Sequence, residues 1–502
     1  MTLFSREPNP APFSFIPTEQ WEGSDGSWNT FGIQVGTPGQ TFRVFASTAS
    51  QETWIPIAGA CGPTDPVNCT QLRGIQNGST TGFNTNASSS WLLANIYSLG
   101  LEDNLNYTGN GEYGFDSIGP GLQDNSLSIG HQIVAGIVTN RFMLGIFGLR
   151  PKDMNFMDSN NPQPSFMSSL RNQSLIPSLS YGYSAGASYR NQSPASLTLG
   201  GYDAAAFKPN NLNFTLNSNA TREMVIGIQE IQADNTLVGT VSLLPQGILS
   251  FIDSTIPEIW LPLEACLIFE NSFGLIFDNY TERYLLNDTV HLKLKELNPT
   301  ITFKLGANAT GGPTIDLTFP YAAFDLEAGW PIYQNQTNYF PLRRALNESQ
   351  FAIGRIFLQE TYLIADYERG DFSISQSVFT ADPKPNVISI LPVEELDTPN
   401  RGISQGVIIG SAVGTFALLT FLCVGIFVYW RFKKKQKKLE ASTKADLKQS
   451  EAENPYLVEI SAGEEGPKEL FALNEFTYTR SAEMDAGLVP EMGGKEIMAE
   501  LP

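Results

Sequence analysis

The feature of the sequence that most constrains the fold is an internal repeat of ten residues. Residues 47–56 read STASQETWIP, and residues 253–262 read DSTIPEIWLP. Both segments carry a hydroxyl at the second position, Glu at the sixth, Trp at the eighth and Pro at the tenth. A chain that repeats one short loop about 200 residues later is expected to form two similar lobes. We expect the two loops to face each other where the lobes meet.

The sequence around the repeat has the pattern of strands and turns. From about residue 28 to 380, short runs of β-branched and aromatic residues are broken by Gly, Asn, Asp and Pro, with few helical periods. The chain has 502 residues and is 42% hydrophobic, which is enough for two cored lobes. We therefore predict an all-β fold with two β-barrel lobes around a cleft, residues 28–205 and 206–380, followed by one transmembrane helix.

Several segments resemble one known family. Residues 36–48, GTPGQTFRVFAST, are similar to the strand that leads a pepsin-like aspartic protease (peptidase A1) into its Asp-Thr-Gly-Ser loop. The resemblance covers about residues 28–380 and implies the two-lobed fold of that family. Further similar segments follow in the family's order: 111–118 (GEYGFDSI), 145–149 (GIFGL), 196–203 (SLTLGGYD), 351–358 (FAIGRIFL) and 362–367 (YLIADY).

The resemblance places Ser47 at the first catalytic aspartate of the family and Asp253 at the second. In this family two carboxylates share one proton and hold a water between them, so that one acts as base and the other as acid. A serine hydroxyl does neither task as a carboxyl does, and the loss of general acid–base help typically costs ~10²–10⁴-fold in rate. We therefore predict an inactive site in which Asp253 is the retained member of the pair.

Both loops depart further from the family pattern. Ala49 and Thr255 stand where the family has glycine, and Ile256 replaces a hydroxyl residue. Thr48 and Ser254, in contrast, keep the hydroxyls through which the family's loops bind each other across the lobes. We predict that these two residues support the contact between the lobes.

The hairpin that would cover the cleft matches the family least. A count without gaps brings Asn104 to the place of the family's flap tyrosine, and Tyr107 replaces it only if the hairpin is rearranged. Asn106 opens a glycosylation sequon on the same hairpin. Both features disfavour a flap that closes over a peptide substrate.

Two other interpretations stay open. A surviving acid endopeptidase requires another carboxylate within hydrogen-bond reach of Asp253, and the repeat offers Glu52 and Glu258, which we expect on the outgoing strands. A structural glycoprotein without a specific ligand has the same sequence signature. The interpretation that we favour is a binding or sensing protein.

Cysteines and sequons indicate the compartment. Cys61 and Cys69 lie eight positions apart and predict one disulfide, whereas Cys266 has no evident partner. Sequons are confined to the first 347 residues, which predicts a glycosylated, extracytoplasmic surface. They begin at Asn68, Asn77, Asn86, Asn106, Asn172, Asn191, Asn213, Asn219, Asn279, Asn287, Asn308, Asn335 and Asn347.

An uncharged run at residues 407–430 exceeds the ~20 residues that cross a bilayer. The basic segment RFKKKQKK follows it, which places the C-terminus in the cytosol. We predict a single-pass type I protein of the plasma membrane or a secretory-pathway membrane, with a stalk at 381–406 and a disordered cytosolic tail at 431–502. Since residues 1–27 contain no apolar run of the length of a secretory signal, we expect the true start upstream. This organisation resembles membrane-anchored aspartic-protease-like proteins of filamentous fungi.

Composition limits the partners. A net charge of -20 disfavours nucleic acid, and the one basic cluster lies beside the predicted membrane span. We expect the lipid bilayer and a peptide or glycan ligand in the cleft as partners. Two distant histidines and no ligand-spaced cysteines predict neither a metal nor another cofactor.

Overall fold

The computed structural model describes most of the first 393 residues. The described residues are 9–76, 82–121, 127–155, 161–380 and 384–393, together with Trp430, Arg431, Lys433 and Lys434. The chain divides into two units, residues 1–397 and 398–502. The predicted membrane span and tail lie outside the described residues except for the four just named, which are helical. Within the described part of the chain, no helix is long and apolar enough to cross a membrane.

The first lobe is built on one sheet of eight strands. In spatial order these are β2 (Pro17–Glu22), β3 (Trp28–Val35), β4 (Gln40–Ser47), β9 (Gly145–Gly148), β5 (Thr53–Pro56), β8 (Ile129–Ile137), β7 (Asn110–Pro120) and β6 (Leu92–Ser98). The pairs β4–β9 and β5–β8 are parallel. Parallel strands need cover on both faces, and β5 and β9 are accordingly buried along their whole length.

The second lobe has a sheet of the same size. In spatial order these strands are β22 (Thr314–Pro320), β21 (Thr300–Gly306), β15 (Val225–Thr236), β17 (Ile248–Ile252), β26 (Ala352–Ile353), β18 (Ile259–Pro262) and β25 (Leu342–Ala345), while β16 (Gly239–Ser242) pairs with β15. The pairs β17–β26 and β18–β25 are parallel. The arrangement β4–β9–β5–β8 of the first lobe is thus repeated as β17–β26–β18–β25.

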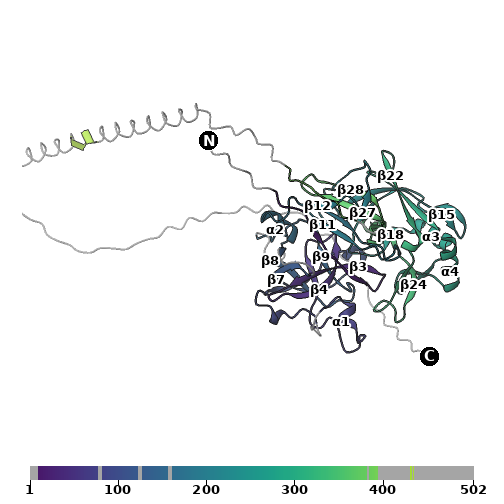
Figure 1. Ribbon diagram of the computed structural model, residues 1–502, viewed down its shortest axis with the longest axis horizontal. Helices are drawn as coiled ribbons and strands as arrows, with labels where there is room; N and C mark the ends of the chain where they lie inside the picture. The colour runs from purple at the N-terminus through teal and green to yellow at the C-terminus, as the bar shows by residue number, and fades with distance from the viewer. Residues whose placement is uncertain are drawn as a thin grey trace, which may run out of the picture. The chain divides into compact units, whose positions relative to one another are not determined.

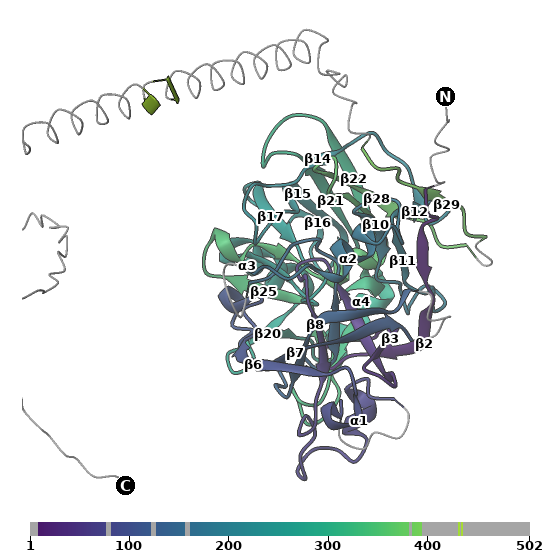
Figure 2. The ribbon, with the colours of Figure 1, turned by 90° about the vertical axis from the view of Figure 1, so that its left-hand side faces the viewer.

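A third sheet contains strands from both halves of the chain. It contains β1 (Phe13–Phe15), β11 (Ser196–Leu199), β10 (Ser180–Ser184), β27 (Thr361–Asp366), β28 (Asp371–Ser377), β13 (Phe207–Lys208) and β14 (Phe214–Thr215). The antiparallel pair β10–β27 joins the halves. Figure 1 shows the purple and blue strands of the first half beside the teal and green strands of the second half, and in the view of Figure 2 the two groups overlap.

Helices and small sheets complete the two lobes. The helices are α1 (Cys69–Leu72), α2 (Phe166–Asn172), α3 (Leu263–Phe273), α4 (Asp288–Leu297) and α5 (Arg355–Glu360), with short 3-10 turns η1 (Thr85–Ala87), η2 (Asp103–Leu105), η4 (Tyr321–Ala323) and η5 (Glu348–Gln350). A four-stranded sheet contains β19 (Ile276–Asp278), β20 (Arg283–Leu285), β24 (Thr337–Phe340) and β23 (Leu326–Ala328), and a pair contains β12 (Gly201–Asp203) and β29 (Val387–Ser389).

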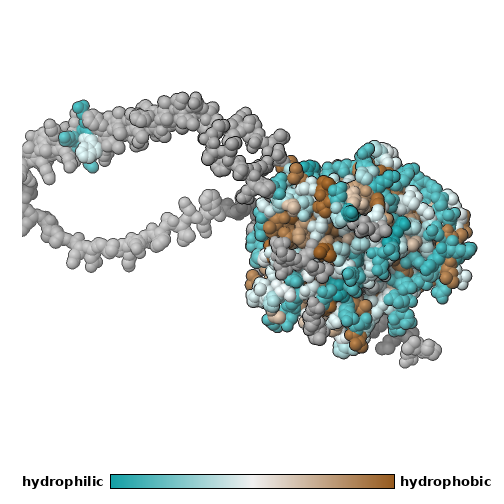
Figure 3. Space-filling view, viewed as in Figure 1, coloured by the Kyte–Doolittle hydropathy of each residue, from teal (hydrophilic) through white to brown (hydrophobic). Residues whose placement is uncertain are grey.

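The folded part extends past the boundaries expected from the sequence at both ends. β1 and β2 precede residue 28, and β29 lies within the predicted stalk at 381–406. Prolines at positions 12 and 17 obscure the strand pattern of β1 and β2, and Pro17 is the first residue of an edge strand, where its missing N–H costs nothing. On the face shown in Figure 3, hydrophobic residues are scattered over a mostly hydrophilic surface, as expected of a surface in contact with water.

Candidate functional site

The two loops of the sequence repeat occupy equivalent places in the two lobes. Ser47 is the last residue of β4, and its carbonyl accepts from the backbone N–H of Leu149 at 2.9 Å. Asp253 directly follows β17, and its backbone N–H donates to the carbonyl of Ile353 at 3.0 Å. Each loop is therefore fixed to the neighbouring parallel strand, β9 or β26.

Two glycines allow these loops to turn tightly. A Cβ on Gly148 would lie 2.6 Å from the backbone N of Glu52, and a Cβ on Gly354 would lie 2.5 Å from the carbonyl oxygen of Ile256. Both distances are too short for any side chain. Gly148, the last residue of β9, and Gly354, which follows β26, are thus required because the paired loops pass too close to them for a side chain.

Thr48 and Ser254 bind each other across the lobes. The N–H of Thr48 donates to Ser254 Oγ at 2.9 Å, and the N–H of Ser254 donates to Thr48 Oγ1 at 3.0 Å. Ser254 Oγ also donates to the carbonyl of Ala46 at 2.6 Å. Both residues are buried, at 2% and 0% exposure, so that these bonds are shielded from water.

Ser47 and Asp253 are connected through Thr255. Ser47 Oγ and Thr255 Oγ1 lie 2.6 Å apart, and the hydroxyl of Thr255 also bonds to the Asp253 carboxylate. The N–H of Thr255 donates to Asp253 Oδ1 at 2.7 Å. Thr255 therefore contacts Ser47 through its hydroxyl and Asp253 through its hydroxyl and its backbone N–H.

The second oxygen of Asp253 has no donor unless a proton is added. Asp253 is fully buried, and its Oδ2 receives no hydrogen bond from an N–H or O–H of the described residues. The carboxyl of Glu102 lies within hydrogen-bond reach of Asp253. Two ionised carboxylates cannot bond to each other, so this contact requires one of them to be protonated.

The environment favours that protonation. Burial raises the pKa of Asp253. Burial and then the charge of Asp253 raise the pKa of Glu102 well above its usual range. Both shifts have the physical causes that place one shared proton on a close carboxyl pair.

The acidic candidates of the repeat lie elsewhere. Trp54 Nε1 donates to Glu52 Oε2 at 3.0 Å, and burial raises the pKa of Glu52 to about 7. Glu258 is fully buried and forms an ion pair with Arg283 at 3.2 Å. Neither has a contact with Asp253 recorded among the described residues. Glu102, which does reach Asp253, is not among the residues predicted from the sequence, because a contact between residues so far apart in the chain depends on the course of the hairpin.

The hairpin residues singled out by the sequence do not lie over Asp253. Tyr107 donates through its hydroxyl to Glu258 Oε2 at 3.2 Å, and its ring packs on Phe142 with 5.5 Å between centroids. Asn104 donates to the carbonyl of Ser349 at 2.8 Å. The recorded contacts of Tyr107 and Asn104 are thus with residues other than Asp253.

Two buried arginines support the loops and were also not foreseen. Arg355 Nη1 donates to the carbonyls of Ser254 and Thr255 at 3.1 and 2.9 Å. Arg150 Nη1 donates to the carbonyl of Ala49 at 3.0 Å. The sequence does contain a signal for these two arginines. Arg150 directly follows GIFGL and Arg355 directly follows FAIG, and these segments are equivalent in the two lobes.

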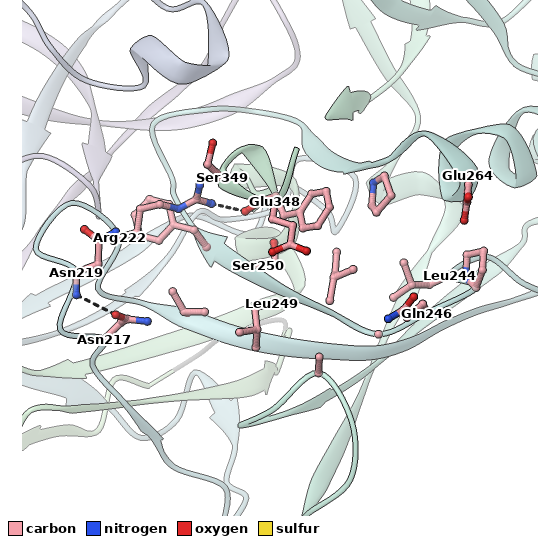
Figure 4. A pocket seen from close by; sticks show the side chains of 18 residues that line it. Asn217, Asn219, Arg222, Leu244, Gln246, Leu249, Ser250, Glu264, Glu348 and Ser349 are labelled. Atoms are coloured by element: carbon pink, nitrogen blue, oxygen red, sulfur yellow. Dashed lines mark hydrogen bonds between the residues drawn. The ribbon is translucent and has the colours of Figure 1, made fainter. Parts of the chain in front are cut away.

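Two cavities lie beside the buried centre. The smaller has a volume of about 420 Å³ and is lined by the first loop and by the hairpin, with Glu52 and Glu102 in its wall. The larger, of about 640 Å³, lies along β17, and Figure 4 shows Leu249 and Ser250 in its middle and Arg222 at one end. Arg222, Asn219 and Ser349 line both cavities, so the two are adjacent.

The remaining predicted sites concern covalent modification. Cys61 and Cys69 form the predicted disulfide, with 5.9 Å between their Cα atoms. Cys266 is a buried free thiol, and burial raises its pKa to about 12. Asn77 lies outside the described residues, and the other twelve sequon asparagines are all exposed.

The fold and the site define a two-lobed β protein whose paired loops bind each other between the lobes, as in an aspartic protease. The sequence pattern of eukaryotic aspartyl proteases matches residues 30–377, and the chain belongs to this family. No curated protein matches the chain.

Proposed function

We propose that this protein is a catalytically inactive member of its family that binds a peptide in the cleft beside Asp253. The observation that carries the proposal is the contact of Ser47 with Thr255. Their hydroxyls lie 2.6 Å apart, and the Thr255 hydroxyl also bonds to Asp253. Positions 47 and 253 therefore do not form a carboxyl pair that holds a water between its members. Position 47 has no carboxyl, and the hydroxyl of Thr255 connects the two positions.

The cavities supply the proposed binding site. The wall of the larger one includes the apolar side chains of Leu249, Phe251 and Phe351. Ser250 and Glu348 lie in its middle and Arg222 lies at one end (Figure 4). Binding sites of this kind take apolar side chains and orient them with a few polar contacts. An extended peptide fits this description better than a glycan, which presents hydroxyls on most faces.

The setting is part of the same proposal. The uncharged run at 407–430 would anchor the protein in the plasma membrane or a secretory-pathway membrane, with residues 1–406 outside and the basic tail in the cytosol. The exposure of the twelve described sequon asparagines supports glycosylation of that outer part. Asn219 lines both cavities, so a glycan there would narrow access to them.

A pool of unstructured peptides tests the binding function. The full chain is expected to retain peptides that are recovered at their original length. Leu249→Glu places a charge on the cavity wall and should lower retention at least about tenfold, the effect of ~1.4 kcal/mol. Leu267→Glu is the matched control, because Leu267 is 49% exposed and Leu249 is 50% exposed, but Leu267 is not in the wall. Equal retention by the two variants would contradict the proposed site.

One observation favours a second candidate, an acid endopeptidase. Glu102 supplies a carboxyl within hydrogen-bond reach of Asp253. An active acid endopeptidase without an aspartate at position 47 requires such a carboxyl. The position of Glu102 on the hairpin disfavours this candidate, since a peptide substrate must pass between the hairpin and Asp253. Acid cleavage that is lost in both Glu102→Gln and Asp253→Asn would establish it.

A further inference from the structure

The loop that carries Glu102 is closed over the site. Residues 99–107 leave the first lobe after β6 and reach the second lobe, where Asn104 donates to the carbonyl of Ser349 at 2.8 Å. Gln350 Nε2 donates in return to the carbonyl of Asn104. Leu105 is 2% exposed beneath this contact. Polar contacts at the tip and a buried leucine therefore hold the loop down.

Glu102 has an unfavourable backbone conformation in this loop. Its φ is 57°, in the left-handed region that few residues other than glycine and asparagine adopt. Such a conformation is unfavourable and persists where other contacts maintain it. The contact that accompanies it is the approach of the Glu102 carboxyl to Asp253.

The charged groups that the structure describes near Glu102 and Asp253 do not form ion pairs with these two acids. Arg222 and Asp103 are charged groups near Glu102, and Arg355 and Arg222 are charged groups near Asp253. Arg355 is engaged with the carbonyls of the second loop, and Arg222 donates to the carbonyl of Phe351. Among the described residues, no ion pair within 4.0 Å is recorded between either arginine and the two acids.

We propose that Glu102 and Asp253 form a proton-dependent latch that holds the 99–107 loop closed over the cleft. With one proton shared between the carboxyls, the protonated oxygen donates to the ionised one and fills the missing bond at Asp253 Oδ2. When that proton passes to solvent, two negative charges remain within hydrogen-bond reach of each other, one of them on the fully buried Asp253, and they repel each other. The loop then loses its central contact and opens.

The latch would regulate the binding site proposed above. The loop forms one wall of the smaller cavity, where Glu52 also gains charge near pH 7. The cleft is therefore expected to be closed in acid and accessible near neutral pH. This consequence rests on the proposed binding function, whereas the latch itself can be observed without a ligand.

Amide hydrogen exchange of the full chain tests the latch. The protection factors of residues 99–107 are corrected for the intrinsic pH dependence of exchange. We expect them to fall at least about tenfold between pH 5 and pH 8, because one unit of pKa shift changes the equilibrium between the closed and open loop about tenfold. Glu102→Gln should keep the protection at pH 8, because its amide donates to ionised Asp253 at both pH values. Asp103→Asn is the matched control and should keep the wild-type pH profile.

Two results would overturn the latch. Either the wild-type loop is equally protected at both pH values, or Glu102→Gln loses protection as the wild type does. A loss of the pH profile in Asp103→Asn would also count against it, because the effect would then follow the net charge of the loop. None of these results depends on peptide binding, so the latch and the binding function can fail separately.

Discussion

At the scale of single residues, Ser47 and Thr255 of the paired loops contact each other, and we propose that they compensate each other. We propose that position 47 has lost the family's carboxyl and that position 255 has gained a side chain; the hydroxyls of Ser47 and Thr255 lie 2.6 Å apart. Ser47 and Thr255 are 0% and 6% exposed, so their volumes must match. The sequence shows both departures, but it does not show that they touch, because contact between loops 208 positions apart is a property of the fold.

Restoring the family's aspartate tests this compensation. Ser47→Asp places a second carboxyl in a filled, buried site and should lower the free energy of unfolding by about 3–5 kcal/mol. Ser47→Asp combined with Thr255→Gly makes room and should cost less than Ser47→Asp alone, with a coupling of about 0.5–3 kcal/mol. Urea unfolding of the single and double variants at pH 5 measures it. Strictly additive losses would show that the two positions do not compensate.

At the scale of elements, the sequence predicted the two equivalent loops but not the course of the 99–107 loop or the strands before residue 28. The ten-residue repeat indicated two equivalent loops, and the structure has them after β4 and β17, each beside a parallel strand. The disulfide between Cys61 and Cys69 was also predicted correctly. The course of the 99–107 loop was not predicted, because it depends on contacts with η5 in the other lobe and on a left-handed residue. The extent of the fold before residue 28 was missed because prolines interrupt its strand pattern.

At the scale of the whole molecule, several buried acids make the fold sensitive to pH. Burial raises the pKa of Asp25, of Glu102 and of Asp253, and that of Glu52 to about 7. The folded state thus binds protons that the unfolded state releases above about pH 4.5. The contribution of these groups to stability is therefore fully present in acid and is lost as the pH rises toward 7. The net charge of -20 at pH 7 acts in the same direction.

Glu52 provides the quantitative test of this pH dependence. A shift from 4.5 to about 7 corresponds to about 3 kcal/mol that is lost between these pH values. Glu52→Gln removes the titration and should flatten the fall in unfolding free energy by up to this amount. Glu264→Gln on the exposed start of α3 is the control and should leave the slope unchanged. If Glu52→Gln keeps the wild-type slope, Glu52 does not titrate in this range.

The measurement that tests the central claim most directly is cleavage of an unstructured protein by the full chain at pH 3 to 5, followed by mass spectrometry of new chain ends. The account predicts that wild type and Asp253→Asn produce the same background, because Asp253 lacks a partner carboxyl at position 47. Cleavage by the wild type that is absent from Asp253→Asn would contradict the account and would make this protein an active acid endopeptidase.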